Sequence, residues 1–139
     1  MTMLPFNRLF PDRSKSDARA LRVRWAHGGL PVDDFVLVEH YCALPGCDCR
    51  RVLLGVVRAS TRAHVATINY VFGTAGDPGG PAGAGASLDT KNTQSELSNE
   101  LLALFVESCV GDPRYVDQIE EHYRLWRQII EDPTRRKRT

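Results

Sequence analysis

The spacing of apolar residues along the chain changes once, at a segment rich in glycine and proline. Residues Gly73–Ala86 contain six glycines and two prolines among fourteen residues, a composition that cannot bury side chains. Before this segment, apolar residues are β-branched or aromatic and tend to alternate with polar ones, whereas after it they recur every three or four residues. Alternation predicts strands and the longer spacing predicts helices. We therefore expect a sheet followed by helices.

Four strands are predicted in the first part of the chain, at Leu21–Trp25, Asp34–Cys42, Arg51–Ala59 and Ala63–Phe72. The gaps between them are short and contain turn residues, which favours antiparallel neighbours. The expected sheet is an antiparallel meander of about four strands.

Two helices are predicted after the glycine-rich segment. The first should begin at a capping box, Thr93-Gln94-Ser95-Glu96, and end at Gly111. The second should begin with Asp112 as its cap and Pro113 as its first residue. Its expected buried face comprises Val116, Ile119, Tyr123, Trp126 and Ile130. Strands followed by helices indicate an α+β fold, with the sheet packed against two C-terminal helices.

A chain of 139 residues fits a single domain. We expect this domain at residues 20–132, with a flexible loop at 73–93, an irregular N-terminal arm at 1–19 and a disordered basic tail at 133–139. No apolar run is long enough to span a membrane. Arg8 and Asp12 interrupt any signal-peptide core, so a cytoplasmic location without membrane attachment is expected.

Three of the four cysteines, Cys42, Cys47 and Cys49, fall within eight residues between the second and third predicted strands. The intervening Leu44-Pro45-Gly46-Cys47 suits a type II turn, with proline second and glycine third. A hairpin tip of this kind brings the three sulfurs toward one point. Converging thiolates select zinc, and structural zinc sites complete four ligands. The sequence therefore predicts a metal knuckle at a hairpin tip, with zinc as the cofactor.

Two other roles are open to these cysteines. An even number of cysteines is also compatible with disulfides or a redox centre, although a reducing compartment disfavours stable disulfides. Simple packing suits one buried cysteine better than three around a Pro-Gly turn. Cys109, on the apolar face of the first helix, is expected to pack in the core.

Two histidines compete to be the fourth ligand. His122 lies beside Ile119 and Trp126 on the inward side of the last helix, and from there it could tie that helix to the hairpin tip. His40 is close in sequence and shares the strand face of Cys42. We favour His122 over His40.

The segments Tyr41–Val52 and Asp112–Arg127 carry the motifs YCxxPGCDCRRV and HYRLWR. They resemble a group of uncharacterised bacterial proteins. This resemblance implies that the cysteines join with His122, and it implies no activity.

The function expected first is a small metal-stabilised binding or regulatory module whose partner is a protein. The chain lacks phosphate-loop and G-x-S-x-G motifs, so an enzyme is the less expected alternative. A zinc-dependent hydrolase would need a general base, for which Glu39 and Asp48 are the local candidates.

A third alternative is nucleic-acid binding through an arginine-rich sheet face. The basic residues that could form it are Arg22, Arg24, Arg50, Arg51, Arg58 and Arg62.

Overall fold

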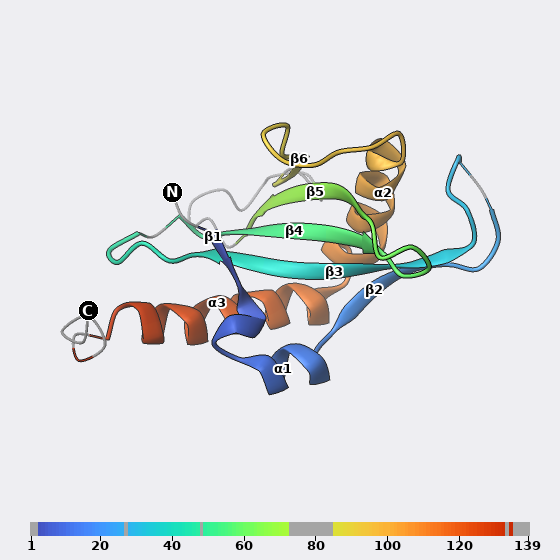
Figure 1. Ribbon diagram of the computed structural model, residues 1–139. Helices are drawn as coiled ribbons and strands as arrows, with labels where there is room; N and C mark the ends of the chain where they lie inside the picture. The colour runs from blue at the N-terminus through green and yellow to red at the C-terminus, as the bar shows by residue number, and fades with distance from the viewer. Residues whose placement is uncertain (1–2, 27, 48, 73–84, 133, 135–139) are drawn as a thin grey trace.

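The computed structural model describes residues 3–26, 28–47, 49–72, 85–132 and 134. It is an α+β fold with an antiparallel sheet and two C-terminal helices, as predicted (Figure 1). In chain order the strands and helices are β1 (Met3–Pro5), α1 (Pro11–Ser16), β2 (Arg19–Val23), β3 (Asp33–Cys42), β4 (Arg51–Arg58), β5 (His64–Val71), β6 (Ala86–Leu88), α2 (Ser98–Phe105) and α3 (Pro113–Ile130). A 3-10 turn at Phe6–Arg8 follows β1, and a π-helical turn at Val106–Val110 follows α2.

Within the described residues the sheet has six strands rather than four. The order is β1-β3-β4-β5-β6, and β2 also pairs with β3. Because β4 occupies one edge of β3, β1 and β2 lie end to end along its other edge, β1 beside residues 40–42 and β2 beside residues 33–37. The four predicted strands correspond to β2–β5. The two additional strands have three residues each, which is too short to produce a recognisable alternation.

The N-terminal arm is not irregular, contrary to the prediction for residues 1–19. Its described part forms β1, the 3-10 turn and α1. Pro5 ends β1 and Pro11 opens α1, where a proline is tolerated because the first helical N–H has no partner within the helix. The flexible loop predicted at 73–93 contains β6 in its described part, and residues 73–84 lie outside the described residues. Of the predicted tail, only residue 134 is described.

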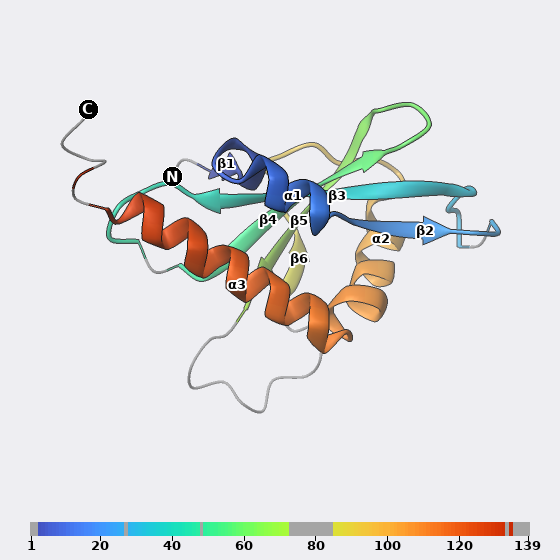
Figure 2. The same ribbon diagram turned by 90° about the horizontal axis from the view of Figure 1, so that it is seen from below.

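Helix α3 crosses one face of the sheet, and Figure 2 shows it running obliquely over the strands. Asp112 caps it as predicted, because its Oδ1 accepts a hydrogen bond from the backbone N–H of Arg114 at 3.1 Å. The buried face of α3 comprises Tyr115, Ile119, His122, Trp126 and Ile130. Tyr115 and His122 are buried where Val116 and Tyr123 were predicted, a shift of one residue at each position. This shift places the imidazole of His122 in the core.

Helix α2 begins at Ser98 rather than at the predicted capping box. Ser95 Oγ accepts from the N–H of Leu97, and Ser98 Oγ accepts from the N–H of Ser95. These two bonds close the turn that leads into α2, whose N-cap residue, Leu97, makes no side-chain cap hydrogen bond. No helix in the described part of the chain is long and apolar enough to cross a bilayer.

Candidate metal centre

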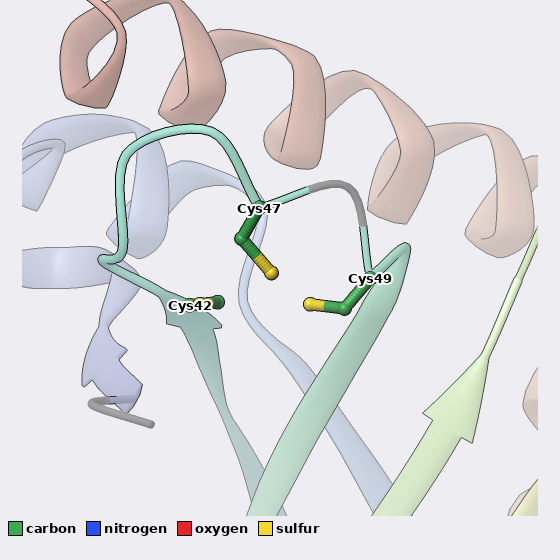
Figure 3. Close-up of side chains that lie close together, drawn as sticks. All are labelled: Cys42, Cys47 and Cys49. Carbon is green, nitrogen blue, oxygen red and sulfur yellow. The ribbon is translucent and has the colours of Figure 1, made fainter.

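The three clustered cysteines meet at one end of the sheet. Cys42 is the last residue of β3, Cys49 lies two residues before β4, and Cys47 lies in the connection between them. Their sulfur atoms lie within 4.8 Å of one another (Figure 3). Cys42 is fully buried and the other two are half-buried. All four cysteines are free thiols, so these three can act together as metal ligands.

The predicted turn brings the sulfurs together. The N–H of Cys47 donates to the carbonyl of Leu44 at 3.2 Å, and Gly46 has a φ of 82°. A type II turn requires a positive φ at its third residue, and glycine adopts it without steric cost. The N–H of Leu44 also donates to Cys42 Sγ at 3.4 Å, so this sulfur accepts a backbone hydrogen bond from the turn.

Helix α3 holds the hairpin tip in place. The indole Nε1 of Trp126 and a guanidinium nitrogen of Arg127 both donate to the carbonyl of Cys42 at 2.9 Å. Arg127 also donates to the carbonyl of Leu44 at 3.0 Å, and Glu131 accepts from the N–H of Gly46 at 2.6 Å while pairing with Arg127. The last helix is therefore tied to the cysteine loop, as the sequence suggested, but by residues other than a histidine.

The surroundings shift the pKa values of two thiols, Cys47 and Cys49, in opposite directions. The backbone N–H of Cys49 and the neighbouring thiols lower the pKa of Cys47, and the positive charge of Arg127 acts in the same direction. Burial and the adjacent Cys47 raise the pKa of Cys49 to about 11. Cys47 is therefore the first of this pair to ionise. A soft cation that displaces the remaining protons suits this donor set.

His122 does not lie with the cysteines. Its Nδ1 is 2.8 Å from Glu39 Oε1 and its Nε2 is 2.8 Å from Asp17 Oδ2, so a carboxylate engages each ring nitrogen. Its ring is fully buried and stacks on Phe6 at a centroid distance of 4.2 Å. The assignment of His122 as fourth ligand is therefore corrected: this residue is the centre of a buried ionic network.

His40 does not complete the site either. Its Nδ1 lies 3.0 Å from the carbonyl of Val38 and 3.3 Å from that of Leu53. Among the histidine, cysteine and acidic side chains that the structure describes, only the three cysteines gather at this point. Cys109 is buried in the core, as predicted.

The two candidate bases for a zinc hydrolase have different outcomes. Glu39 accepts hydrogen bonds from Tyr41 and engages His122, so it belongs to the buried network. Asp48 lies outside the described residues.

The structure places three of the arginines proposed for a nucleic-acid surface, Arg22, Arg51 and Arg58, in the strands of the sheet. Arg22 lies opposite Asp34 in the β2–β3 pair, and Arg58 donates to Asp33 at 2.7 Å. Arg51 begins β4 and Arg58 ends it, which separates them by the length of the strand.

No protein-family model, curated protein or solved structure matches this chain. Its function therefore has to follow from the chemistry of its own residues.

Sequence reasoning missed two sets of residues near or behind this site. Arg127 and Glu131 are four residues apart on α3, a spacing that signals a helical ion pair but does not reveal that the pair holds a loop. Asp17, which engages His122, lies 105 residues earlier in a segment without periodicity. No local pattern could connect those two residues.

Proposed function

We propose that Cys42, Cys47 and Cys49 bind one zinc ion and that the ion has a structural role. The observation that carries the proposal is the convergence of three thiols within 4.8 Å at a hairpin tip. Thiolate sulfur is the donor that zinc prefers in structural sites. Bound metal would join the end of β3, the turn and the start of β4, and would fix the loop that α3 contacts.

We further propose that the domain acts as a binding module for a protein partner. Trp25 is 74% exposed and Val32 is 60% exposed, and both lie near the β2–β3 connection. This connection is at the opposite end of the sheet from the cysteine loop (Figure 1). Tryptophan is enriched among residues that dominate protein interfaces. In this proposal the metal stabilises one end of the domain and the partner contacts the other.

Metal analysis of the purified protein tests the zinc proposal. Protein prepared without chelator should contain about one zinc per chain. Cys47→Ser and Cys49→Ser should each lose most of this zinc, because a hydroxyl is a poor replacement for a thiolate ligand. The measurement is elemental analysis together with a count of reactive thiols before and after chelation.

Cys109→Ala provides the matched control, because it removes a cysteine that lies in the core rather than in the cluster. It should keep the zinc content of the unmodified protein. Purified protein with all thiols reduced and no bound metal would contradict the proposal, as would equal zinc loss in Cys109→Ala and Cys47→Ser.

A further inference from the structure

A cavity of about 330 Å³ lies beside the cysteine loop, between the sheet and the second half of α3. Three arginines, two aromatic rings and one carboxylate line it: Arg50, Phe72, Glu120, Tyr123, Arg124 and Arg127. Arg50 directly follows Cys49, and Arg127 donates to the carbonyls of the cysteine loop. The cavity therefore shares a wall with the candidate metal centre.

The backbone at Arg50 adopts a conformation that arginine rarely takes. Its φ is 43°, in the left-handed region, which is unfavourable for a residue with a side chain. Its N–H donates to the hydroxyl of Tyr123 at 3.4 Å, and its carbonyl accepts from the N–H of Phe72 at 3.0 Å. Both partners line the same cavity. Strained residues held in this way concentrate at functional sites.

A second arginine, Arg62, also has a positive φ, of 60°. It lies in the hairpin connection between β4 and β5, where its N–H donates to the carbonyl of Arg58. Turn formation accounts for its conformation. Arg50 is the last residue of the β3–β4 connection, and the two residues that its backbone hydrogen bonds engage, Tyr123 and Phe72, both line the cavity.

Two of the arginines that line the cavity, Arg127 and Arg124, differ in the protein groups that they contact. Arg127 pairs with Glu131 and holds the cysteine loop. Arg124 is exposed and makes no ion pair or hydrogen bond with any residue that the structure describes. Its guanidinium is therefore available for an external anion. Glu120, one helical turn earlier, adds a carboxylate that can accept hydrogen bonds from hydroxyl or amino groups.

The aromatic side chains provide a second type of contact. Phe72 is 3% exposed and forms the deep wall, with its ring 5.1 Å from that of Tyr123 in an edge-to-face arrangement. The Tyr123 ring is half-buried at the cavity. Guanidinium groups beside an aromatic ring suit a ligand that carries both a phosphate and a planar base.

We propose that this cavity binds a nucleotide unit, with the phosphate at Arg124 and Arg50 and the base against Tyr123. The inference goes beyond the protein-binding role proposed above and does not depend on it, because the cavity lies at a location separate from Trp25. A nucleotide unit can come from a free mononucleotide or from a single-stranded nucleic acid.

Fluorescence anisotropy on the zinc-loaded full chain tests the proposal. The probes are a labelled single-stranded DNA of about ten nucleotides and, in competition, AMP and inorganic phosphate. Arg124→Glu should weaken DNA binding at least about tenfold, because a charged hydrogen bond is lost and a repulsive charge is gained. Arg124→Ala should also reduce the slope of log affinity against log salt by about one.

Two further variants separate binding from folding. Arg50→Gly removes the guanidinium and relieves the left-handed strain, so it should weaken binding, and a stability measurement on the same variant separates that loss from a change in folding. Arg114→Ala is the control, because Arg114 is an exposed arginine at the other end of α3. The affinity of this variant for the DNA should match that of the unmodified protein.

The outcomes separate the ligand sources and the two proposals. If AMP competes with an affinity equal to that of the DNA, the ligand is a free nucleotide. If the DNA binds much more tightly than AMP, the ligand is a single-stranded nucleic acid. Zinc-loaded protein that binds neither probe, or Arg124→Glu and Arg114→Ala with equal affinities, overturns the inference and leaves the zinc proposal intact. Nucleotide binding by protein that never contains metal overturns only the zinc proposal.

Discussion

His122→Ala should destabilise the protein by about 3–5 kcal/mol, the range expected when one partner of a buried ionic group is removed. The imidazole is 0% exposed and lies between the carboxylates of Asp17 and Glu39, at 2.8 Å from each. Without it, two negative groups face each other across a cavity, and the ring that stacks on Phe6 is lost. Denaturant unfolding of the zinc-loaded protein measures this change.

The same variant decides whether His122 binds the metal. Because its ring nitrogens engage carboxylates rather than thiols, folded His122→Ala should keep about one zinc per chain. His40→Ala provides the control, because Nδ1 of His40 lies at the backbone carbonyls of Val38 and Leu53 and the residue is half-buried. It should cost clearly less stability than His122→Ala. Folded His122→Ala that loses zinc, or that is as stable as His40→Ala, would contradict the network described here.

The network also predicts the sign of a pH dependence. Burial alone would lower the pKa of His122, but the hydrogen bonds and charges of Glu39 and Asp17 outweigh it and raise the pKa above 6.5. A group whose pKa is raised by folding stabilises the protein fully below its unfolded pKa. This contribution is lost as the pH rises from 6.5 through the raised value.

The neighbouring groups act at other pH values. The hydrogen bond from His122 lowers the pKa of Asp17, with Arg13 contributing, so the contribution of Asp17 is lost only under acid conditions. Burial raises the pKa of Tyr41 well above 10. Arg13 also pairs with Glu121 at the network's outer edge.

In zinc-loaded protein, the free energy of unfolding should therefore fall as the pH rises from 6.5 through the raised pKa of His122, and His122→Gln should reduce that fall. Unfolding titrations at a series of pH values, run on both proteins, measure the difference. Parallel curves for the two proteins would show that His122 carries no raised pKa.

The parts of the fold that sequence patterns predicted are those determined by neighbouring residues. Strands β2–β5 have enough residues to display alternation, and the cysteine loop carries its three thiols and its turn within eight residues. Gly46 is the clearest case, because the positive φ at this position is a local requirement of the turn. Local chemistry of this kind is visible in a single sequence.

The fourth-ligand prediction failed because it depended on how a helix crosses the sheet. The pattern placed both His122 and Trp126 on the inward face of α3, and both are buried. These residues are one turn apart, which is about 5–6 Å along the helix. The crossing brings Trp126 and Arg127 to the carbonyl of Cys42 and leaves His122 over Glu39.

The N-terminal arm was the other source of error. Asp17 lies at the end of α1, and Gln118 also donates to its backbone carbonyl at 2.9 Å. The arm docks on α3 through such long-range polar contacts and through Phe6, which is buried and stacks on His122. A segment of this type gives no periodic signal, so its ordered structure and its role beside His122 could not be predicted.

Removal of the metal should produce the second large effect, and it should be localised. Ligand bound only to the folded state stabilises it by about 4 kcal/mol when the free ligand is a thousandfold above its Kd. Chelation of protein kept at that excess of free zinc should therefore lower the free energy of unfolding by about that amount. The protein should remain folded, because the core between the sheet and the helices includes residues far from the cysteine loop, among them Phe35, Phe105 and Ile119.

Amide hydrogen exchange can locate this effect. Metal loss should speed exchange in residues 43–47 and 49–51 and in the last turn of α3, because Arg127 and Glu131 bond to the backbone of the cysteine loop. The middle of α3, around Ile119 and His122, should stay protected, because the buried network and core hold it independently of the metal. Cys47→Ser should reproduce the pattern of chelated protein without any chelator. Uniform loss of protection along α3 would mean instead that the metal supports the whole core, and unchanged protection in residues 43–47 would mean that no metal organises the hairpin tip.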